Sequence, residues 1–273
     1  MEAAALEAYE KFLFQIPSPG PESRFRSDDM RKDLTIMFIE FREHAWSRPV
    51  LRNVAHVYGS DDSAQLAVVC GRSNHKYLQD IVLGEGIVDC KFVVLHEIDN
   101  VDRMEYNHLL TTSEFWRTIQ SNVAAEHVLL VQTDTLTRKR VPRSLLQYDY
   151  VGAPWKTPQR GGSPHRCVGN GGYSLRRVQA MIDVCELKRF IFERDLAEDL
   201  FFSKHSALVP KAEEASAFAV EHVMHPDPCG MHQIWVHHLW KGWSWFAEWM
   251  AVAVGAQKEK EEPKKKAVVE RVL

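Results

Sequence analysis

The sequence HVLLVQTDTL, residues 127–136, carries the clearest structural signal in the chain. Its first five residues form a short, mostly apolar run, and the polar residues Gln132, Thr133 and Asp134 follow directly. Apolar runs without polar alternation are typical of parallel strands that are covered on both faces by helices. Open parallel sheets bind ligands beyond the carboxyl ends of their strands. The segment therefore predicts a buried strand that ends at a functional edge.

Similar runs lie upstream and alternate with segments whose apolar residues fall at helical spacing. We expect strands at Leu34–Phe41, Gln65–Cys70, Lys91–Leu95 and His127–Val131. We expect helices at Val50–Tyr58, His75–Leu83, Glu105–Leu110 and Ser113–Gln120, the last of them capped by Thr112. This alternation, without hairpin turns, predicts βαβ units and an α/β fold with a mostly parallel central sheet flanked by helices.

The region after Thr135 is rich in glycine and proline and does not continue the regular alternation of expected strands and helices. Ser174–Leu187 is expected to be a helix, because Leu175, Val178, Met181, Ile182 and Cys185 would form one apolar stripe. Lys156–Arg166 is interpreted as a loop that closes over a bound ligand.

The chain has 273 residues, of which 45% are hydrophobic and 26% charged, which suits one large α/β domain. We expect an N-terminal helix and linker at 1–32, the main domain at 33–255 and a charged, disordered tail at 256–273. The net charge of -3 favours neither nucleic acid nor an anionic membrane as a partner.

We expect no export signal in this sequence. A basic segment followed by a long apolar run is missing from its start, and no stretch reaches the roughly 20 apolar residues of a transmembrane helix. Five cysteines without a CxxC pair fit a reducing compartment. We therefore expect a soluble, cytoplasmic protein. The aromatic segment 234–254 is interpreted as an amphipathic helix that closes the domain, with a peripheral membrane contact as the alternative.

Asp134 is the first candidate ligand-binding residue. A carboxylate at a strand end suits Mg²⁺ or Mn²⁺ that holds a diphosphate, since these ions use few protein carboxylates and complete their shell with phosphate and water. The alternative is that Asp134 begins a turn or caps the next segment.

Two glycine-containing motifs follow. In YDYVGAPW, residues 148–155, Gly152 permits a close backbone approach and Trp155 offers a flat face for a sugar, or else belongs to a buried aromatic cluster. In VGNGGYSLRR, residues 168–177, Gly169, Asn170, Gly171 and Gly172 precede the expected helix. Backbone N–H groups at a helix start attract anions. The alternative is a tight turn with an N-cap at Ser174.

Two further motifs contain ionisable side chains. In AEDLFFSK, residues 197–204, Glu198 and Asp199 precede two phenylalanines. An apolar environment raises the pKa of a carboxyl group, as a general base requires, although acids also simply favour a helix start. In CGMHQIW, residues 229–235, His232 could complete a metal site with Asp134 or be structural.

These five motifs in this order resemble a glycosyltransferase-like family of unassigned function found in large algal viruses and microbial eukaryotes. The family pattern combines QTD, YDYxGAPW, GNGGxSLR, EDxFF and GxH, and FWRTI and KAEEASAFAVEH also fit it. The resemblance covers about residues 33–235. The family is similar in turn to GT-A glycosyltransferases and, more distantly, to the fringe-like β1,3 group.

The resemblance implies a single GT-A-like domain with a smaller acceptor-side subregion, in which a strand-end DxD motif binds a metal and the nucleotide diphosphate. Asp134 matches the last acid of that motif, whereas Gln132 stands at the first, which leaves strict metal dependence open. The downstream acids imply Asp199 as the base, with Glu198 as second choice. A C-terminal histidine that completes the metal shell maps onto His232.

The implied activity is that of a hexosyl- or pentosyltransferase, which moves a sugar from a UDP- or GDP-sugar donor to a glycan or glycoconjugate acceptor with inversion and with Mn²⁺ or Mg²⁺. The residues expected at the donor are Glu40, Arg42, Gln132, Thr133, Asp134, Gly152, Trp155, Gly169, Asn170, Gly171 and Gly172.

Two alternatives stay open. One is a nucleotide-sugar or glycan-binding protein without catalysis, as Gln132 could indicate. The other is a nucleotidyltransferase, although residues 41–47 lack its glycine-rich phosphate loop.

Overall fold

The computed structural model describes residues 33–59, 61, 64–123, 125–163 and 167–233. The expected N-terminal helix and linker at 1–32, the aromatic segment at 234–254 and the tail at 256–273 lie outside the described residues. None of the described helices combines the length and the apolar character that crossing a bilayer demands.

The first half of the described chain alternates strands with helices, as the sequence predicts. It contains β1 (Leu34–Ile39), α2 (Ser47–Tyr58), β2 (Ala64–Gly71), α3 (His75–Gly84), β3 (Lys91–Leu95), α4 (Arg103–Leu110), α5 (Ser113–Asn122) and β4 (His127–Val131). The side chain of Thr112 accepts a hydrogen bond from the Phe115 amide, which confirms it as the N-cap of α5.

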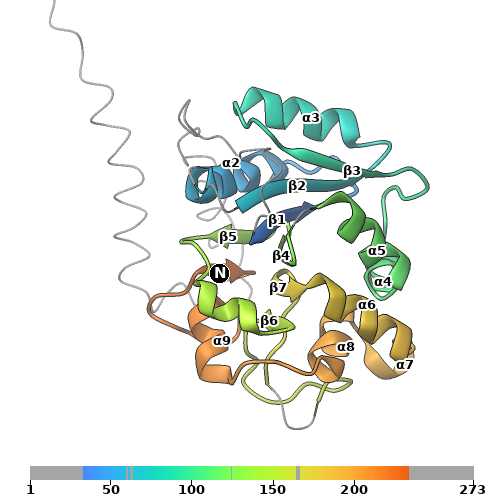
Figure 1. The fold of residues 1–273 in the computed structure, drawn as a ribbon, viewed down its shortest axis with the longest axis vertical. Coiled ribbons are helices and arrows are strands. Elements are labelled where there is room, and N and C mark those ends of the chain that lie inside the picture. The colour runs from blue at the N-terminus through green and yellow to red at the C-terminus, as the bar shows by residue number, and fades with distance from the viewer. Residues whose placement is uncertain (1–32, 60, 62–63, 124, 164–166, 234–273) are drawn as a thin grey trace, which may run out of the picture.

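These strands form the parallel part of a six-stranded sheet with the order β3-β2-β1-β4-β7-β6 (Figure 1). Leu34 of β1 pairs with Ala64 of β2 on one side and with His127 of β4 on the other. The chain therefore runs outward from β1 through β2 to β3, and then returns to place β4 on the opposite side of β1. The gap between the carboxyl ends of β1 and β4 is a topological switch point, where open sheets of this kind bind ligands.

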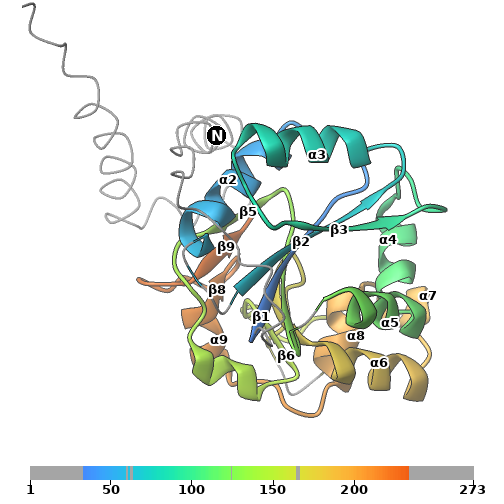
Figure 2. The same cartoon turned by 45° about the horizontal axis from the view of Figure 1, so that its top comes forward.

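Helices cover both faces of the sheet (Figure 2). On β1, Ile36 and Phe38 point into one core cluster, which includes residues of α2 and α3. Met37 and Ile39 point into the other, which includes residues of α5, α6 and α8. Because successive side chains of a strand point to opposite faces, a strand with helices on both faces has no polar alternation. The predicted α/β fold with a mostly parallel, helix-flanked sheet is confirmed.

The second half of the described chain adds short strands and helices. They are β5 (Thr135–Thr137), the 3₁₀ helix η1 (Arg143–Gln147), β6 (Tyr150–Gly152), β7 (Tyr173–Arg177), α6 (Val178–Leu187), α7 (Phe192–Asp195), α8 (Glu198–His205), α9 (Ala212–Phe218), β8 (Ala219–Val220) and β9 (Gly230–His232). Strand β7 lies antiparallel to both β4 and β6. Strands β5, β9 and β8 form a separate three-stranded sheet.

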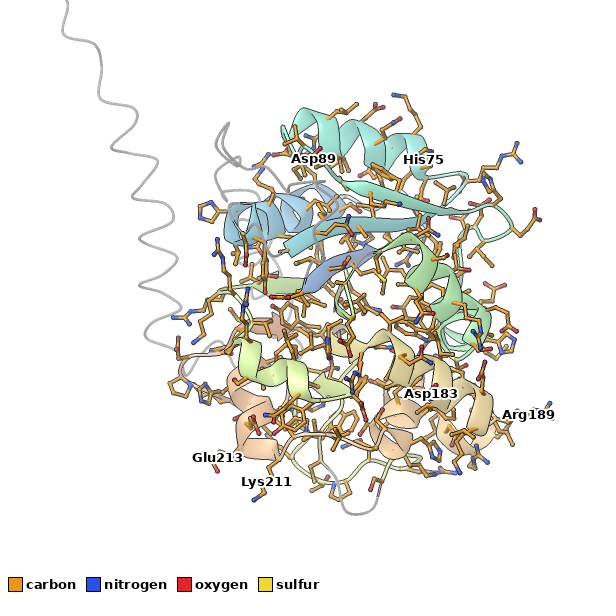
Figure 3. All side chains as sticks on the ribbon, in the orientation of Figure 1. His75, Asp89, Asp183, Arg189, Lys211 and Glu213 are labelled. Carbon is orange, nitrogen blue, oxygen red and sulfur yellow. The ribbon has the colours of Figure 1, made fainter. Side chains whose placement is uncertain are left out.

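The prediction of one helix over Ser174–Leu187 is wrong in its first turn. Tyr173–Arg177 is strand β7, because its backbone pairs with β4 on one side and β6 on the other. Only Val178–Leu187 is helical, and there the predicted stripe of Val178, Met181 and Ile182 is buried. Asp183 projects outward from this helix (Figure 3).

A buried ion pair joins β7 to α8. The Arg176 guanidinium donates to both carboxylate oxygens of Glu198, at 2.7 and 3.0 Å, and the two side chains are almost fully shielded from water. The same guanidinium lies over the rings of Trp116, Tyr150 and Phe202 at 5.2–5.7 Å from their centroids. Arg176 thus links the sheet, α8 and the aromatic core, which explains why a charged residue occupies a central strand.

We predict that Arg176→Met lowers the free energy of unfolding by about 3–5 kcal/mol, because Glu198 is left buried without its cation. The double variant Arg176→Met with Glu198→Gln should recover much of this loss. Urea unfolding followed by circular dichroism measures both. Arg177→Met, which removes a partly exposed partner of Glu126, is the control and should cost about 1 kcal/mol or less. A double variant no more stable than Arg176→Met alone would contradict the ion-pair argument.

Candidate active site

A cavity of about 240 Å³ opens at the switch point between β1 and β4. Its walls come from the ends of these two strands and from the start of α4. The lining residues are Ile39, Glu40, Phe41, Arg42, Val101, Asp102, Arg103, Tyr106, Gln132, Thr133 and Asp134. Five of the residues predicted to bind the donor are among them: Glu40, Arg42, Gln132, Thr133 and Asp134.

Glu40 organises the β1 side of the cavity. Its Oε1 accepts hydrogen bonds from the amides of Phe41 and Arg42 at 2.9 and 3.0 Å, and the Arg42 guanidinium donates to both of its oxygens. Contact with Glu40 raises the pKa of Arg42, whose side chain is 56% exposed. Glu40 therefore fixes the backbone that follows β1, whereas the Arg42 guanidinium is accessible to a ligand.

Gln132 and Thr133 connect the β4 side to its neighbours. The Gln132 side-chain amide donates to the Tyr106 hydroxyl at 2.8 Å, and its backbone N–H donates to the Gly172 carbonyl at 3.1 Å. The Thr133 hydroxyl lies 3.5 Å from Glu40 Oε2. Gln132 thus holds α4 and the glycine turn against the end of β4.

Asp134 and His232 meet beside the cavity. Asp134 Oδ1 lies 3.2 Å from His232 Nε2, and Asp134 Oδ2 accepts a hydrogen bond from the Gln233 side-chain amide at 2.6 Å. On the other edge of the imidazole, Nδ1 lies 3.4 Å from Glu221 Oε1. Asp134, His232 and Glu221 thus form a row. The three-stranded sheet creates it, because Thr135, which follows Asp134, pairs with His232, and Val220, which precedes Glu221, pairs with Met231.

The row is strongly coupled electrostatically. Burial opposes ionisation of Asp134, but His232 and Gln233 outweigh it and lower the pKa of the carboxyl to about 2. Burial likewise opposes a charge on His232, but Asp134 and Glu221 raise its pKa to about 10. Burial of Glu221 also opposes its ionisation, but His222 and His232 outweigh this effect and lower its pKa to about 2. Without a cation, the row is a protonated imidazole between two carboxylates.

The geometry of Asp134 and His232 also fits a divalent cation. Asp134 Oδ1 and both ring nitrogens of His232 are buried and lack a hydrogen-bond partner of good geometry among the described residues. Adjacent ligands of an octahedral ion at ~2.1 Å lie about 3 Å apart, close to their separation of 3.2 Å. In the described ranges, no three His, Cys, Asp or Glu side chains could hold a metal by themselves. Two protein ligands suit an ion that takes the rest of its shell from phosphate and water.

The glycine turn lies between this row and α8. A Cβ on Gly172 would come within 2.2 Å of His232 Nε2, and one on Gly171 within 2.4 Å of Glu198 Oε1. The expected anion site at a helix start is wrong, because the turn leads into strand β7. Moreover, the Gly171 N–H donates to Asp199 Oδ2 and the Gly172 N–H to Asn170 Oδ1. The turn positions side chains and has already used these donors.

Gly152, Trp155 and Gly169 support the turn from behind. A Cβ on Gly152 would lie 2.2 Å from the Asn170 carbonyl oxygen, and the Trp155 ring packs on Gly169, whose φ of +152° favours glycine. Trp155 is only 7% exposed. Neither Gly152 nor Trp155 lines the cavity, so the buried aromatic alternative describes Trp155 better than a sugar-stacking face does.

The two acids of α8 have different environments. Glu198 is occupied by Arg176, whereas Asp199 is partly accessible and accepts hydrogen bonds from the amides of Gly171 and Leu200 at 3.2 and 2.7 Å. Burial, followed by the charge of Glu198, raises the pKa of Asp199 to about 7. Asp199 can therefore exchange a proton near neutral pH, whereas the Glu198 carboxylate is held in an ion pair with Arg176.

The structure brings together the strand end at Asp134, the glycine turn, His232 and Asp199. Sequence reasoning missed Tyr106 and Arg103 in the cavity wall, Arg176 behind the turn, and Glu221 and Gln233 beside the histidine. Glu221 lies in KAEEASAFAVEH, a segment that fits the family pattern, and this was the one signal for it.

Fold and site together define an α/β protein with a polar ligand cavity at the switch point of its sheet. The chain belongs to the family described as "Protein of unknown function (DUF5672)", whose model matches residues 90–232. The matched span contains the sequences QTD, YDYVGAPW, GNGGYSLR, EDLFF and GMH. No curated protein matches the chain.

Several solved structures are similar to this one. An active-site mutant of LgtC matches with a TM-score of 0.49 and 14% identity over 81% of this chain and 95% of that chain. Galactosyltransferase LgtC with donor and acceptor sugar analogues gives a TM-score of 0.45 and 13% identity over the same shares. S. aureus TarS 1-349 with UDP-GlcNAc gives 0.42 and 12% over 65% and 55%.

We predict that Asp199→Asn stabilises the protein at pH 8 but not at pH 4. Because the folded carboxyl has a pKa of about 7 and the ordinary value for aspartate is 3.8, the folded state holds a proton that the unfolded state releases between these values. Stability due to this group therefore falls as pH rises from ~4 to ~7, and the substitution removes that loss. We expect a gain of about 1–3 kcal/mol at pH 8, since asparagine replaces only one of the two acceptors.

Urea unfolding at pH 4, 6 and 8 measures this effect. Asp183→Asn, on the exposed face of α6, controls for the loss of one negative charge. If Asp199→Asn were less stable than the wild type at pH 8, the ionised Asp199 carboxylate would not destabilise the folded state, and the prediction would be wrong.

Proposed function

We propose that this protein is a glycosyltransferase that moves a sugar from a nucleotide-sugar donor to an acceptor hydroxyl, with a divalent cation held by Asp134 and His232. One observation carries the proposal. Asp134 lines the cavity at the switch point, its Oδ1 faces His232 Nε2, and a single glycine turn joins this pair to the Asp199 carboxylate.

The donor diphosphate is assigned to the cavity. A bound Mn²⁺ or Mg²⁺ would act there as a Lewis acid that neutralises charge on the departing nucleotide. Arg42 and Arg103 line the same cavity and provide guanidinium donors for phosphate oxygens. Gln132 keeps Tyr106 and the glycine turn in place around the ligand. The donor is expected to be a UDP- or GDP-sugar.

Asp199 is the proposed general base. Two backbone amides fix the direction of its carboxylate, and a pKa of about 7 allows it to be ionised near neutral pH and still accept a proton. The acceptor hydroxyl loses its proton to Asp199 and attacks the anomeric carbon opposite the departing diphosphate, so the configuration inverts. Glu198 stays paired with Arg176 and keeps α8 against the turn.

We predict that a nucleoside diphosphate and Mn²⁺ together raise the melting temperature more than either does alone, because each completes the binding site of the other. Asp134→Asn should abolish this joint effect, while Asp80→Asn, on the exposed surface of α3, should retain it. Thermal denaturation with UDP, GDP, their sugars and Mn²⁺ measures it. Stabilisation by a nucleotide alone, unchanged in Asp134→Asn, would contradict the proposed metal site. A response to nucleoside triphosphates only would favour a nucleotidyltransferase.

We predict that Asp199→Asn keeps the joint shift with donor and Mn²⁺ but lowers kcat for transfer at least 100-fold, since the base contributes about 10²–10⁴-fold. In the wild type, kcat should rise with pH and level off above ~7, because only the ionised carboxylate accepts a proton. The measurement is nucleotide release with the donor that gives the largest thermal shift and a panel of acceptor glycans. A wild type that binds donor but transfers to no acceptor would indicate a binding protein. Full activity in Asp199→Asn would assign the base elsewhere.

A further inference from the structure

Glu221 lies on the opposite edge of the His232 ring from Asp134. The parallel pairing of β8 with β9 puts Val220 opposite Met231, so the next residue along each strand is Glu221 and His232. The antiparallel pairing of β5 with β9 puts Thr135, which follows Asp134, opposite His232. The small sheet thus places a carboxylate on each side of one imidazole.

The His232 ring has little freedom to turn. Its Nε2, Cδ2 and Cε1 atoms occupy the space where a Gly172 Cβ would stand, within 2.2–2.7 Å of that position. The residue is only 6% exposed, and Glu221 is 5% exposed. Nδ1 lies 3.4 Å from Glu221 Oε1, while Nε2 lies 3.2 Å from Asp134 Oδ1. The two nitrogens are therefore assigned to different carboxylates.

Nε2 faces Asp134, so a cation shared with Asp134 would take the lone pair of that nitrogen. The proton of a neutral imidazole then belongs on Nδ1, where the Glu221 carboxylate favours it. Glu221 is on the far edge of the ring, so it acts through the imidazole and does not join Asp134 as a direct ligand. Carboxylates in this position fix the tautomer and orientation of metal-binding histidines and make them better ligands.

We infer that Glu221 is a positioning residue that holds His232 with its proton on Nδ1, so that Nε2 faces a divalent cation shared with Asp134. This inference rests on the proposed function and names a residue that neither the strand-end motif nor the cavity lining includes. His222 also lies close to Glu221: its Nδ1 is 3.3 Å from Oε2, and its side chain is 32% exposed. His222 provides a matched control at the same carboxylate.

The test measures binding of Mn²⁺ from the electron paramagnetic resonance signal of the free ion, with and without UDP. Glu221→Gln keeps the side-chain volume but removes the charge, and it should weaken Mn²⁺ binding about 10–100-fold. His222→Gln should change the affinity by about twofold or less. Circular dichroism of each variant without metal checks the fold.

A second readout follows the tautomer itself. The ¹⁵N spectrum of histidine-labelled, Mg²⁺-loaded protein should show His232 protonated at Nδ1 in the wild type, and a loss of that preference in Glu221→Gln. A purely structural role for Glu221 would lower stability without moving this signal. If Glu221→Gln does not fold, Glu221→Asp replaces it. Because its carboxylate stands farther from Nδ1, it should weaken Mn²⁺ binding and lower the preference for a proton on Nδ1, both to a smaller extent than Glu221→Gln.

The outcomes separate the two proposals. If the wild type binds Mn²⁺, and Glu221→Gln binds it with the same affinity and has the same His232 tautomer, the inference is overturned. The proposed metal site then remains intact. The inference is overturned in the same way if Glu221→Asp binds Mn²⁺ as tightly as the wild type and leaves the tautomer unchanged. Failure of the folded wild type to bind Mn²⁺, with or without UDP, would remove the metal site and the inference with it.

Discussion

The contact of the Gly171–Gly172 turn with the side chains on either side of it holds the two halves of the site together. The His232 ring fills the space beside Gly172, and Glu198 and Asp199 fill the space beside Gly171. A Cβ at either position would overlap these atoms at 2.2–2.4 Å, so the histidine or the acids would have to move. Because Gly171 and Gly172 have no side chains, the candidate cation site and the candidate base can lie this close to the turn, and this determines the distance between them.

Strand direction explains how the turn arrives there. The parallel strands β1 and β4 end at one edge of the sheet, and an antiparallel strand must begin at that same edge. Because β7 is antiparallel to β4, the turn that precedes it lies beside Gln132, whose N–H bonds to the Gly172 carbonyl. The antiparallel direction of β7 thus has a functional consequence, since it places the glycine turn at the ligand edge.

The sequence predicted β1 to β4 and their helices because local apolar patterns determine those elements. It placed a helix over β7, because Leu175 fits both a strand and the stripe that continues at Val178. The charge of Arg176 gave no sign of a strand interior, since its partner Glu198 comes from α8. Asp134, His232 and Asp199 could be proposed from motifs. Their relation to Glu221 could not, because it depends on the register of two very short strands.

Gln132 is the point at which the chain departs from a strand-end pair of acids, and the structure gives this departure a physical meaning. Its side-chain amide is bound to Tyr106, so the residue works as a link between β4 and α4. Within the QTD motif, Asp134 then provides the carboxylate of the proposed cation site. A second negative charge is still close, because Glu221 contacts the far edge of His232. A neutral imidazole between Glu221 and a cation transmits part of that charge through its polarised N–H bond. The site can thus keep two acids near a cation while leaving one coordination position for an imidazole in place of a carboxylate.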